Sequence, residues 1–319
     1  MTRANGVGST EPYREGRGGF AGASRKYVPL VSVLAGLWGA SYLFIKIGIR
    51  GFEPATMMTI RLWVAAAMLA GFLAVRGELG ALRRAPLGAF ALGLVNAALP
   101  FTLIAWGEKH VDSGTAAVAN SGVPLFVALL APWFASGERV RGLRLGGLLL
   151  GFGGVAWLVG LHPRVGWWFV AGTIAIVVAT LSYAVGSLYG QHLVARTSGP
   201  VLATAAYVGA AVVLLPLGAV QAPHGWPGWE PLAAVLALSL FGTAIAQLLW
   251  FRLLVRYGSS RSTLVSYLVP AVALVYGTVF LDEPLGVAKL GAFALILAGV
   301  VIASGAARPR LRSTPVEAR

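Results

Sequence analysis

Three side chains that could bind an organic molecule recur at helical spacing near the start of the chain. Trp38, Tyr42 and Lys46 are four residues apart, so on a helix they share one face. They offer an indole N–H, a phenol hydroxyl and an ammonium group, which suit reversible binding through hydrogen bonds, ring contact and charge. The positions 145 residues later repeat the stripe with Tyr183, Ser187 and Gln191. A polar and aromatic stripe that occurs twice is expected to line a pathway or the seam between two halves.

Two prolines mark a second set of polar positions. Pro124 and Pro270 each lie near the middle of a long apolar segment, at matching places in the two halves. A proline within a helix frees the carbonyl four residues earlier, so both are predicted to kink a helix. One interpretation is a kink that serves packing, and the other is a polar lining for a bound molecule. The polar residues just before the prolines are Asn120, Ser121, Ser266 and Tyr267.

A third set of polar residues lies on two further helices that correspond in the repeat. Asn96 and Trp106 lie on the third predicted helix, and Gln247 and Trp250 lie on the eighth. Uncharged polar side chains in such helices either join helix to helix or line a cavity, and both interpretations remain open.

Lys46 and Arg61 are the cations that fall within apolar segments. A charge in such a segment suggests a functional role, here recognition of an anionic group. The structural alternatives are that Lys46 reaches the membrane surface and that Arg61 pairs with Glu53.

The remaining titratable residues argue against catalysis. The eleven carboxylates and four histidines all fall in tails, loops or the ends of apolar segments. Proton coupling through a buried Asp or Glu is therefore disfavoured, although Glu108 and His110 remain possible carriers at a segment end. The absence of cysteine excludes disulfides and thiol chemistry, and no HExxH or P-loop motif occurs. We expect no enzyme activity, cofactor or metal.

The elements that position these residues must be membrane helices. The chain has 319 residues, 57% of them hydrophobic and 11% charged, with a mean hydropathy of +0.78. Its apolar residues form continuous runs of about twenty residues, which is helical rather than barrel patterning. The predicted spans are 27–45, 56–75, 85–107, 113–137, 145–161, 165–190, 197–223, 231–251, 262–281 and 290–307.

The distribution of basic residues predicts the orientation of these spans. With the N-terminus inside, the inner segments hold 19 Lys and Arg residues and the outer segments hold four. Because basic residues accumulate in cytoplasmic loops, both termini are expected in the cytoplasm of a cell whose inner membrane holds the protein. The charge of +14 is then explained without nucleic acid. Residues 1–26 and 308–319 are predicted to be cytoplasmic tails, the first of them disordered.

A duplication organises the whole chain. Glu138 matches Glu283, Gly146 matches Gly291 and Gly154 matches Gly299, each at an offset of 145. Each half holds five predicted helices, so the second half must start on the side where the first one ends. The sequence therefore predicts an all-α membrane protein of ten helices in two inverted repeats, residues 27–162 and 163–307.

The same residues resemble a known family. The Trp38-Gly39 pair, Lys46, Pro54, Arg61 and the segment GTAIAQLLWFRLLVRYGSSRSTLVSYLVPAVALVYGTVFLDEP are similar to EamA-type transporters of the drug/metabolite transporter superfamily. The resemblance covers residues 28–306. It implies a ten-helix, alternating-access carrier, often an exporter of amino acids, metabolites or drugs.

The expected function is thus export of a small metabolite or amino-acid-like solute. A channel-like facilitator and a flippase of lipid precursors on the same fold are the alternatives. Partners are the substrate and the lipid bilayer, with coupling to protons or to a counter-substrate and the oligomeric state left open. The candidate substrate-binding residues are Trp38, Tyr42, Lys46, Asn96, Trp106, Asn120, Ser121, Tyr183, Ser187, Gln247, Ser266 and Tyr267, with Pro124 and Pro270 as helix kinks.

Overall fold

The described part of the chain consists of helices and short connecting segments. The computed structural model describes residues 20–134, 141–160, 166–194, 197–258, 262 and 264–303. The helices of the first half are α1 (Phe20–Gly48), α2 (Pro54–Val75), α3 (Leu79–Leu82), α4 (Leu87–Gly93), η1 (Leu94–Ala98), α5 (Leu99–Glu108), α6 (Ser113–Asn120), α7 (Val123–Phe134) and α8 (Leu143–Gly160). Those of the second half are α9 (Trp167–Val194), α10 (Gly199–Val220), α11 (Trp229–Ser239), η2 (Leu240–Ile245), α12 (Ala246–Tyr257), α14 (Leu264–Leu281) and α15 (Val287–Ala303). Helix α1 thus begins at Phe20, so that residues 20–26, which the sequence predicts to be part of a disordered tail, are helical.

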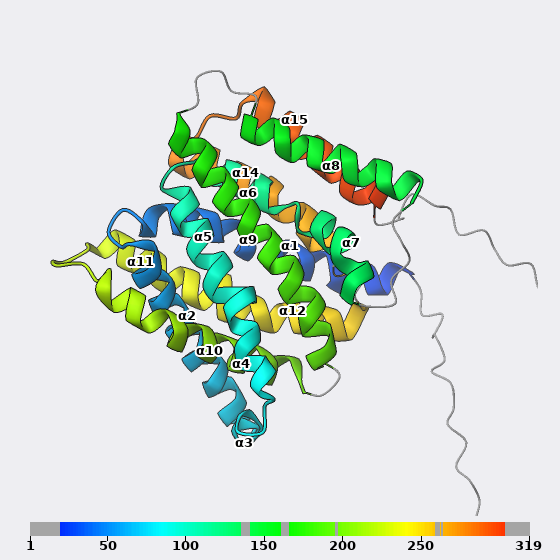
Figure 1. The fold of residues 1–319 in the computed structure, drawn as a ribbon. Helices are drawn as coiled ribbons and strands as arrows, with labels where there is room; N and C mark the ends of the chain where they lie inside the picture. The colour runs from blue at the N-terminus through cyan, green and yellow to red at the C-terminus, as the bar shows by residue number, and fades with distance from the viewer. Residues whose placement is uncertain are drawn as a thin grey trace, which may run out of the picture.

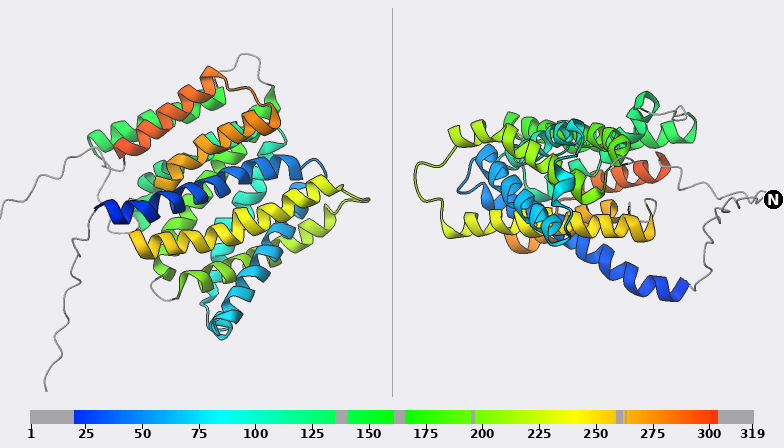
Figure 2. Two further views of the ribbon diagram at one scale, coloured as in Figure 1. Left: turned by 180° about the vertical axis from the view of Figure 1, so that it is seen from behind. Right: turned by 90° about the horizontal axis from the view of Figure 1, so that it is seen from below.

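Eight helical stretches in this part of the chain are long and apolar enough to cross a membrane. Two further apolar helices, Leu143–Leu158 and Val287–Ala303, are shorter. They coincide with the fifth and tenth predicted spans, so their lengths alone leave the prediction of ten crossings unconfirmed. The described ends of α1 and α15 lie on the same side of the bundle, and α8 and α15 run side by side along one edge (Figures 1 and 2).

The third and eighth spans each contain a short π-helical segment at corresponding positions. Segment η1 separates α4 from α5, and η2 separates α11 from α12. A π-helical turn widens the helix locally and redirects the side chains beside it, and such turns are common at functional sites. The duplication therefore extends to a local irregularity that the sequence pattern did not reveal.

The two matched prolines have different local structures. Helix α6 ends at Asn120, and Pro124 lies in the first turn of the separate helix α7. Pro270, in contrast, lies inside the continuous helix α14. At Pro124 the predicted kink is a break between two helices, because Ser121 and Gly122 form a turn there. A proline without an N–H is well accommodated in a first helical turn, where that donor would have no partner.

Glycines bring α8 and α15 into close contact. A Cβ atom on Gly299 would lie 2.5 Å from the Cα atom of Gly151, and one on Gly154 would lie 2.9 Å from the Cβ atom of Leu295. Small residues of this kind allow membrane helices to approach closely without a hydrophobic driving force. The glycine pair Gly154 and Gly299, matched in the repeat, therefore lies at one helix interface.

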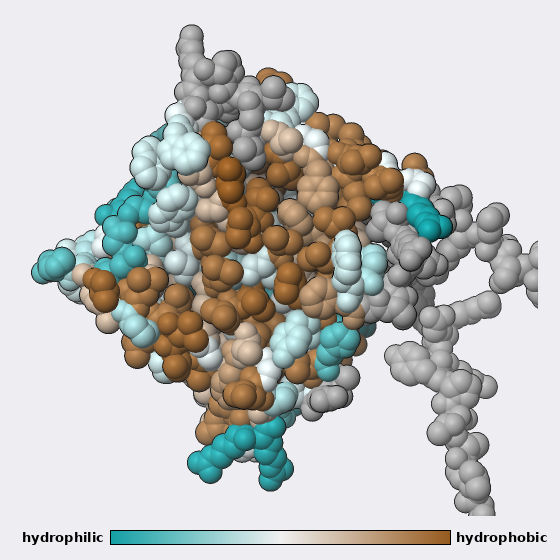
Figure 3. All heavy atoms as spheres, in the orientation of Figure 1, coloured by the Kyte–Doolittle hydropathy of each residue, from teal (hydrophilic) through white to brown (hydrophobic). Residues whose placement is uncertain are grey.

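The outer surface has the polarity expected in a bilayer. Large apolar side chains such as Val212, Val213 and Val279 are more than half exposed. In Figure 3 apolar residues cover the middle of the visible face, and polar residues gather at its left and lower edges. An exposed apolar band of this extent is unfavourable in water and is expected to face lipid.

Candidate functional site

A cavity of about 350 Å³ lies where the two halves of the chain meet. Its walls come from α1, α2, α5, α6, α7, α9, α10, α12 and α14 and from both π-helical segments. The lining residues are Trp38, Ser41, Tyr42, Ile45, Arg61, Asn96, Phe101, Ile104, Ala117, Asn120, Ser121, Val123, Pro124, Tyr183, Ser187, Tyr207, Gly242, Gln247, Trp250, Ser266, Val269 and Pro270. A volume of this size is sufficient for a small metabolite.

Most of the residues selected from the sequence meet in this cavity. Nine of the twelve candidate residues line it, and so do both prolines. The nine are Trp38, Tyr42, Asn96, Asn120, Ser121, Tyr183, Ser187, Gln247 and Ser266. Asn96 and Gln247, the polar residues of the third and eighth spans, are thus both on the cavity wall.

Hydrogen bonds join several of these side chains across helices. Asn120 donates from its Nδ2 atom to the hydroxyl of Tyr42 over 2.8 Å, and it accepts from Thr180 over 3.2 Å. On the opposite wall the hydroxyl of Tyr207 donates to Oε1 of Gln247 over 3.2 Å. These bonds hold the polar groups of the cavity in defined positions, which reduces the entropy lost when a ligand binds.

Aromatic rings form the remaining walls. The ring centroids of Trp38 and Trp250 are 5.4 Å apart, and those of Phe101 and Tyr183 are 6.2 Å apart. Such rings present a large apolar surface together with polar atoms at their edges. The cavity can therefore hold a molecule that has both an apolar part and a polar group.

Arg61 is the charged side chain of this cavity. It is only 6% exposed, and its Nε atom donates to Oγ1 of Thr243 over 2.8 Å. Its Cζ atom lies 3.6 Å from the centroid of the Phe101 ring, in a cation–π arrangement. Among the described residues no carboxylate forms an ion pair with Arg61. Glu53, one of the alternative partners that the sequence offered, instead binds Lys109 at 2.8 Å. A charge inside a span was the signal that could have placed Arg61 among the candidates.

The second and seventh spans were missing from the predicted lining. They contribute Arg61 and Tyr207, respectively. Tyr207 had no repeated stripe or neighbouring proline to single it out, so its position depends on how α10 packs against α2.

Three candidate residues lie elsewhere. Nζ of Lys46 donates to the backbone carbonyls of Glu108 and Val111, the latter at 2.6 Å, rather than reaching the surface. Trp106 packs edge-on against His110, with centroids 4.7 Å apart. Tyr267 packs against the hydrophobic core. Tyr42 and Ile104 line the cavity, whereas Lys46 and Trp106, which follow them on the same helices, do not. Helical spacing alone does not predict this difference.

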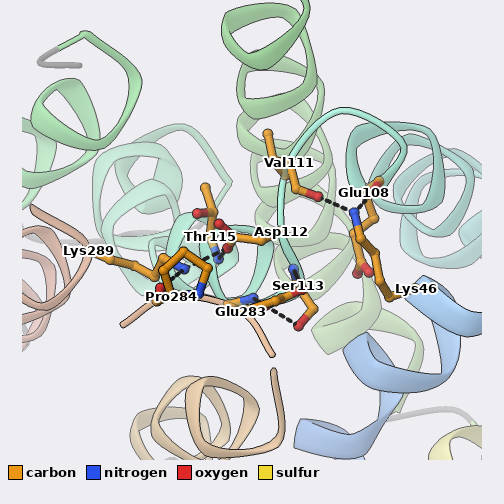
Figure 4. Close-up of polar contacts among 10 residues, drawn as sticks. Lys46, Glu108, Val111, Asp112, Ser113, Thr115, Glu283, Pro284 and Lys289 are labelled. Carbon is orange, nitrogen blue, oxygen red and sulfur yellow. Dashed lines mark hydrogen bonds and ion pairs between the residues drawn. The ribbon is translucent and has the colours of Figure 1, made fainter. Parts of the chain in front are cut away.

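A second cavity, of about 510 Å³, is lined by Lys46 and by several other charged side chains. Its lining includes Arg50, Glu108, Lys109, Asp112 and Glu283. Figure 4 shows Lys46 beside the carbonyls of Glu108 and Val111, with Glu283 at the start of α6. We name it the outer cavity, because it lies at the helix ends for which the sequence predicts an external location.

Glu283 closes the start of α6 from the other half of the chain. Its carboxylate accepts from the backbone N–H and hydroxyl of Ser113 at 2.7 and 2.8 Å, and from the N–H of Gly114 at 3.1 Å. Nearby, Lys289 donates to Oδ1 of Asp112 over 2.9 Å. The first amide groups of a helix lack internal partners and favour negative charge, so this carboxylate ties α6 to the segment after α14. Glu138, the residue matched to Glu283, lies outside the described residues.

His110 gives the outer cavity a measurable response to pH. Burial, together with the positive charges of Lys109 and Lys46, lowers the pKa of its imidazole from the ordinary value. The unfolded chain therefore gains a proton as pH falls through about 6.5, while folded His110 stays neutral to lower pH. Because the unfolded state then binds more protons, the folded state loses stability as pH falls through that value.

We accordingly expect the variant His110→Phe to lose less thermal stability than the wild type between about pH 7.5 and pH 5.5. Phenylalanine keeps the ring stacked on Trp168, where the centroids are now 4.9 Å apart, but it cannot titrate. Melting temperatures of purified protein in detergent measure the effect. The same replacement at exposed His224 serves as the control, and equal pH responses of wild type and His110→Phe would contradict the prediction.

Comparison with known proteins decides the family. The EamA-like transporter family matches the chain twice, over residues 25–160 and 170–305. This chain belongs to the EamA-like transporter family. The two matches are offset by 145 residues, the same offset as the duplication seen in the sequence.

Relatives in this family are described as membrane transporters. The chain is 30% identical to the uncharacterized inner membrane transporter YedA of Escherichia coli (strain K12), over 87% of this chain and 91% of that protein. It is 32% identical to a probable terminal-alkyne amino-acid exporter of Streptantibioticus cattleyicolor, over 87% and 94% of the two chains. A probable amino-acid metabolite efflux pump of Escherichia coli (strain K12) is 25% identical over 88% and 95%.

A solved crystal structure shares the fold. It aligns with a TM-score of 0.65 at 21% identity and covers 92% of this chain and 99% of the other. Family, relatives and apolar helices together indicate an inner-membrane, multi-pass transporter rather than an enzyme. A small-molecule substrate and the lipid bilayer are the partners that this implies.

Proposed function

We propose that this protein is a secondary carrier that exports a small, amino-acid-like metabolite by alternating access. The central cavity is its substrate site, and Arg61 binds the carboxylate of the substrate. The observation that carries the proposal is a buried guanidinium that lines the cavity without a carboxylate partner among the described residues. A positive charge in this setting is costly unless a ligand supplies the negative one.

The chemistry of arginine matches a carboxylate. Its planar guanidinium carries five N–H donors in a fork that can bind two carboxylate oxygens at once. The bond from Nε to Thr243 holds the side chain in place on one edge, and the ring of Phe101 supports one face. Of the remaining N–H groups, those of Nη1 meet only the sulfur of Met58, a weak acceptor, at 3.7 Å. A carboxylate can therefore replace that contact, in a site of lower dielectric than water, where charge-assisted hydrogen bonds are strong.

The rest of the cavity suits an apolar side chain and an amino group. The paired rings of Trp38 and Trp250 provide apolar surface, and the amide oxygen of Gln247 and the hydroxyl of Ser266 provide acceptors. Two relatives are described as exporters of amino acids or their metabolites, which favours this substrate class and the outward direction.

The proposed transport cycle requires two antiparallel halves. Residues 27–162 and 163–307 would each cross the membrane five times and rock about the cavity between them. The excess of basic residues in the predicted inner segments supports cytoplasmic termini. The common side of the described ends of α1 and α15 is consistent with an even number of crossings.

Ligand-induced stabilisation tests the proposal with matched probes. Purified protein is heated with L-leucine or with L-leucinol, which lacks the carboxylate but keeps the amino group and side chain; L-propargylglycine extends the series to alkyne amino acids. A ligand present at 100 times its Kd adds about 2.7 kcal/mol to the free energy of unfolding. We expect amino acids to stabilise the protein and amino alcohols to have little effect.

Flux in proteoliposomes then separates a carrier from a channel. Unlabelled amino acid on one side should accelerate entry of labelled amino acid from the other. The reason is that a carrier changes its open side faster with substrate bound than with an empty site. Equal stabilisation by L-leucine and L-leucinol, or flux without such counterflow, would overturn the proposal.

A further inference from the structure

Glu108 is a fully buried carboxylate that nothing in the proposed substrate site uses. It is the last residue of α5, at the end of the third span, and its side chain is 0% exposed. Neither Oε1 nor Oε2 has a hydrogen-bond partner. The sequence indicates only that Glu108 lies at a span end and is a possible proton carrier. Its complete burial is the feature that the structure adds.

Lys46 is close to Glu108 but does not neutralise it through a direct bond. Its ammonium group donates to the backbone carbonyls of Glu108 and Val111 and so ties α1 to the end of α5. Figure 4 shows the side chain of Glu108 pointing toward Lys46. The nearest cation is thus held by neutral oxygen atoms, while the carboxylate oxygens have no donor.

Several charged groups from other elements face this carboxyl group. Lys46 of α1, Arg61 of α2, Asp112 before α6 and Glu283 after α14 all interact with it electrostatically. The other titratable or charged residues of the outer cavity are Arg50, Lys109 and His110. Glu108 therefore forms part of the wall of the outer cavity and also interacts electrostatically with Arg61 of the central cavity.

A proton is the ligand that this arrangement fits best. Leaving an ionised carboxylate buried without donors is costly, whereas a protonated carboxyl group carries no charge to desolvate. A metal ion would require several oxygen or nitrogen ligands. Within the described residues no group of three or more His, Asp or Glu side chains could hold one.

We propose that Glu108 is the proton-binding site that couples this carrier to a proton gradient. The inference rests on the proposed function, since coupling requires a transported substrate. In the state open to the outside, a hydronium ion in the outer cavity transfers one proton to a carboxylate oxygen of Glu108, leaving water. In the state open to the cytoplasm, the carboxyl group gives that proton to water. One proton thus enters the cell for each substrate molecule that leaves.

The position of Lys46 connects this proton to the central cavity. When Glu108 is ionised, its carboxylate competes with the two carbonyls for the ammonium group of Lys46, and when it is protonated it does not. The ammonium group of Lys46 thus has different partners in the two protonation states, and this changes how the end of α1 is held. Helix α1 also carries Trp38 and Tyr42 of the cavity wall. Protonation can therefore bias the carrier between two states, because the two sites share one helix.

The test compares wild type with Glu108→Gln in proteoliposomes loaded with labelled L-leucine. Glutamine preserves the size of the buried side chain but binds no proton. With an inward proton gradient of about one pH unit, one coupled proton supports about a tenfold substrate gradient. We expect wild type to expel L-leucine against such a gradient, and Glu108→Gln to lose that response while retaining counterflow.

A control and a substrate-independent measurement complete the design. Glu230→Gln removes an exposed carboxylate that pairs with Arg50 at 2.9 Å, and it should keep the proton-driven response. Infrared spectra of the wild type, recorded over a pH titration, should contain a protonated-carboxyl band with the amplitude of one group. The spectra of Glu108→Gln should lack this band.

The outcomes separate the two proposals. Proton-driven export by Glu108→Gln at the wild-type level would overturn the role of Glu108 and leave the substrate site standing. A wild-type protein that transports no amino acid, but shows the infrared band, would overturn the substrate class while supporting a protonatable Glu108. Identical infrared spectra for wild type and Glu108→Gln would contradict proton binding.

Discussion

Replacing Arg61 with glutamine is expected to weaken binding of L-leucine about 10- to 100-fold and to abolish its export at low concentration. Hydrogen bonds to charged groups contribute about 1.5–3 kcal/mol, and each 1.4 kcal/mol changes a binding constant about tenfold. Arg61→Lys should recover only part of the affinity, because an ammonium group cannot bind both carboxylate oxygens in a fork. Thermal stabilisation gives the binding constants, and proteoliposome flux gives the transport rates.

The controls distinguish a ligand contact from a structural role. Arg50→Gln removes a charge whose side chain is 52% exposed, and it should change neither quantity. L-Leucinol, which has no carboxylate, should bind wild type and Arg61→Gln equally. Unfolding is not the expected defect, since removal of a buried charge relieves a desolvation cost. Equal loss of L-leucine and L-leucinol binding would show that Arg61 shapes the cavity rather than binding the carboxylate.

Introducing a leucine at Gly154 should lower the thermal stability of the protein far more than the same change at the adjacent Gly153. Even a Cβ atom on Gly154 would lie 3.0 Å from the backbone oxygen of Ala292, whereas a Cβ on Gly153 meets nothing within 4 Å. Overpacking of this kind costs about 1–3 kcal/mol or more, because the two helix backbones must separate. Melting temperatures in detergent, together with the yield of monodisperse protein, measure the difference.

Gly153→Leu is a demanding control for this prediction. Both positions are glycines inside α8, so both variants gain the same helix propensity from losing a glycine. Any difference in stability then reports the contact between α8 and α15. Equal melting temperatures for the two variants would contradict the close packing of these helices.

The repeat explains why so much of the cavity could be predicted. Residues that recur at one offset, such as Trp38 and Tyr183, lie at equivalent places in two similar folding units. When the units pack together, these places converge near the seam. Trp38, Tyr42, Tyr183 and Ser187 of the stripes therefore meet Asn120, Ser121 and Ser266 in one cavity, although no contact between helices is known from the sequence.

The misassigned residues show the limit of that reasoning. Lys46 shares the predicted helix face with Tyr42, yet it binds carbonyls at the end of α5 instead of lining the central cavity. The sequence offers Glu53 as a possible partner of Arg61, but Glu53 pairs with Lys109. Partners of a long charged side chain depend on neighbouring helices, and helical periodicity contains no information about them.

Hydropathy, charge asymmetry and duplication are properties of the chain itself, and they were enough to predict a membrane carrier of two related halves. They suffice because lipid imposes helices of a set length and because basic residues mark one side of the membrane. The burial of Arg61 and Glu108, the break before Pro124 and the π-helical segments became evident only in the folded protein. Each depends on which helices come into contact, since the cost of a buried charge or an open backbone group is set by its neighbours.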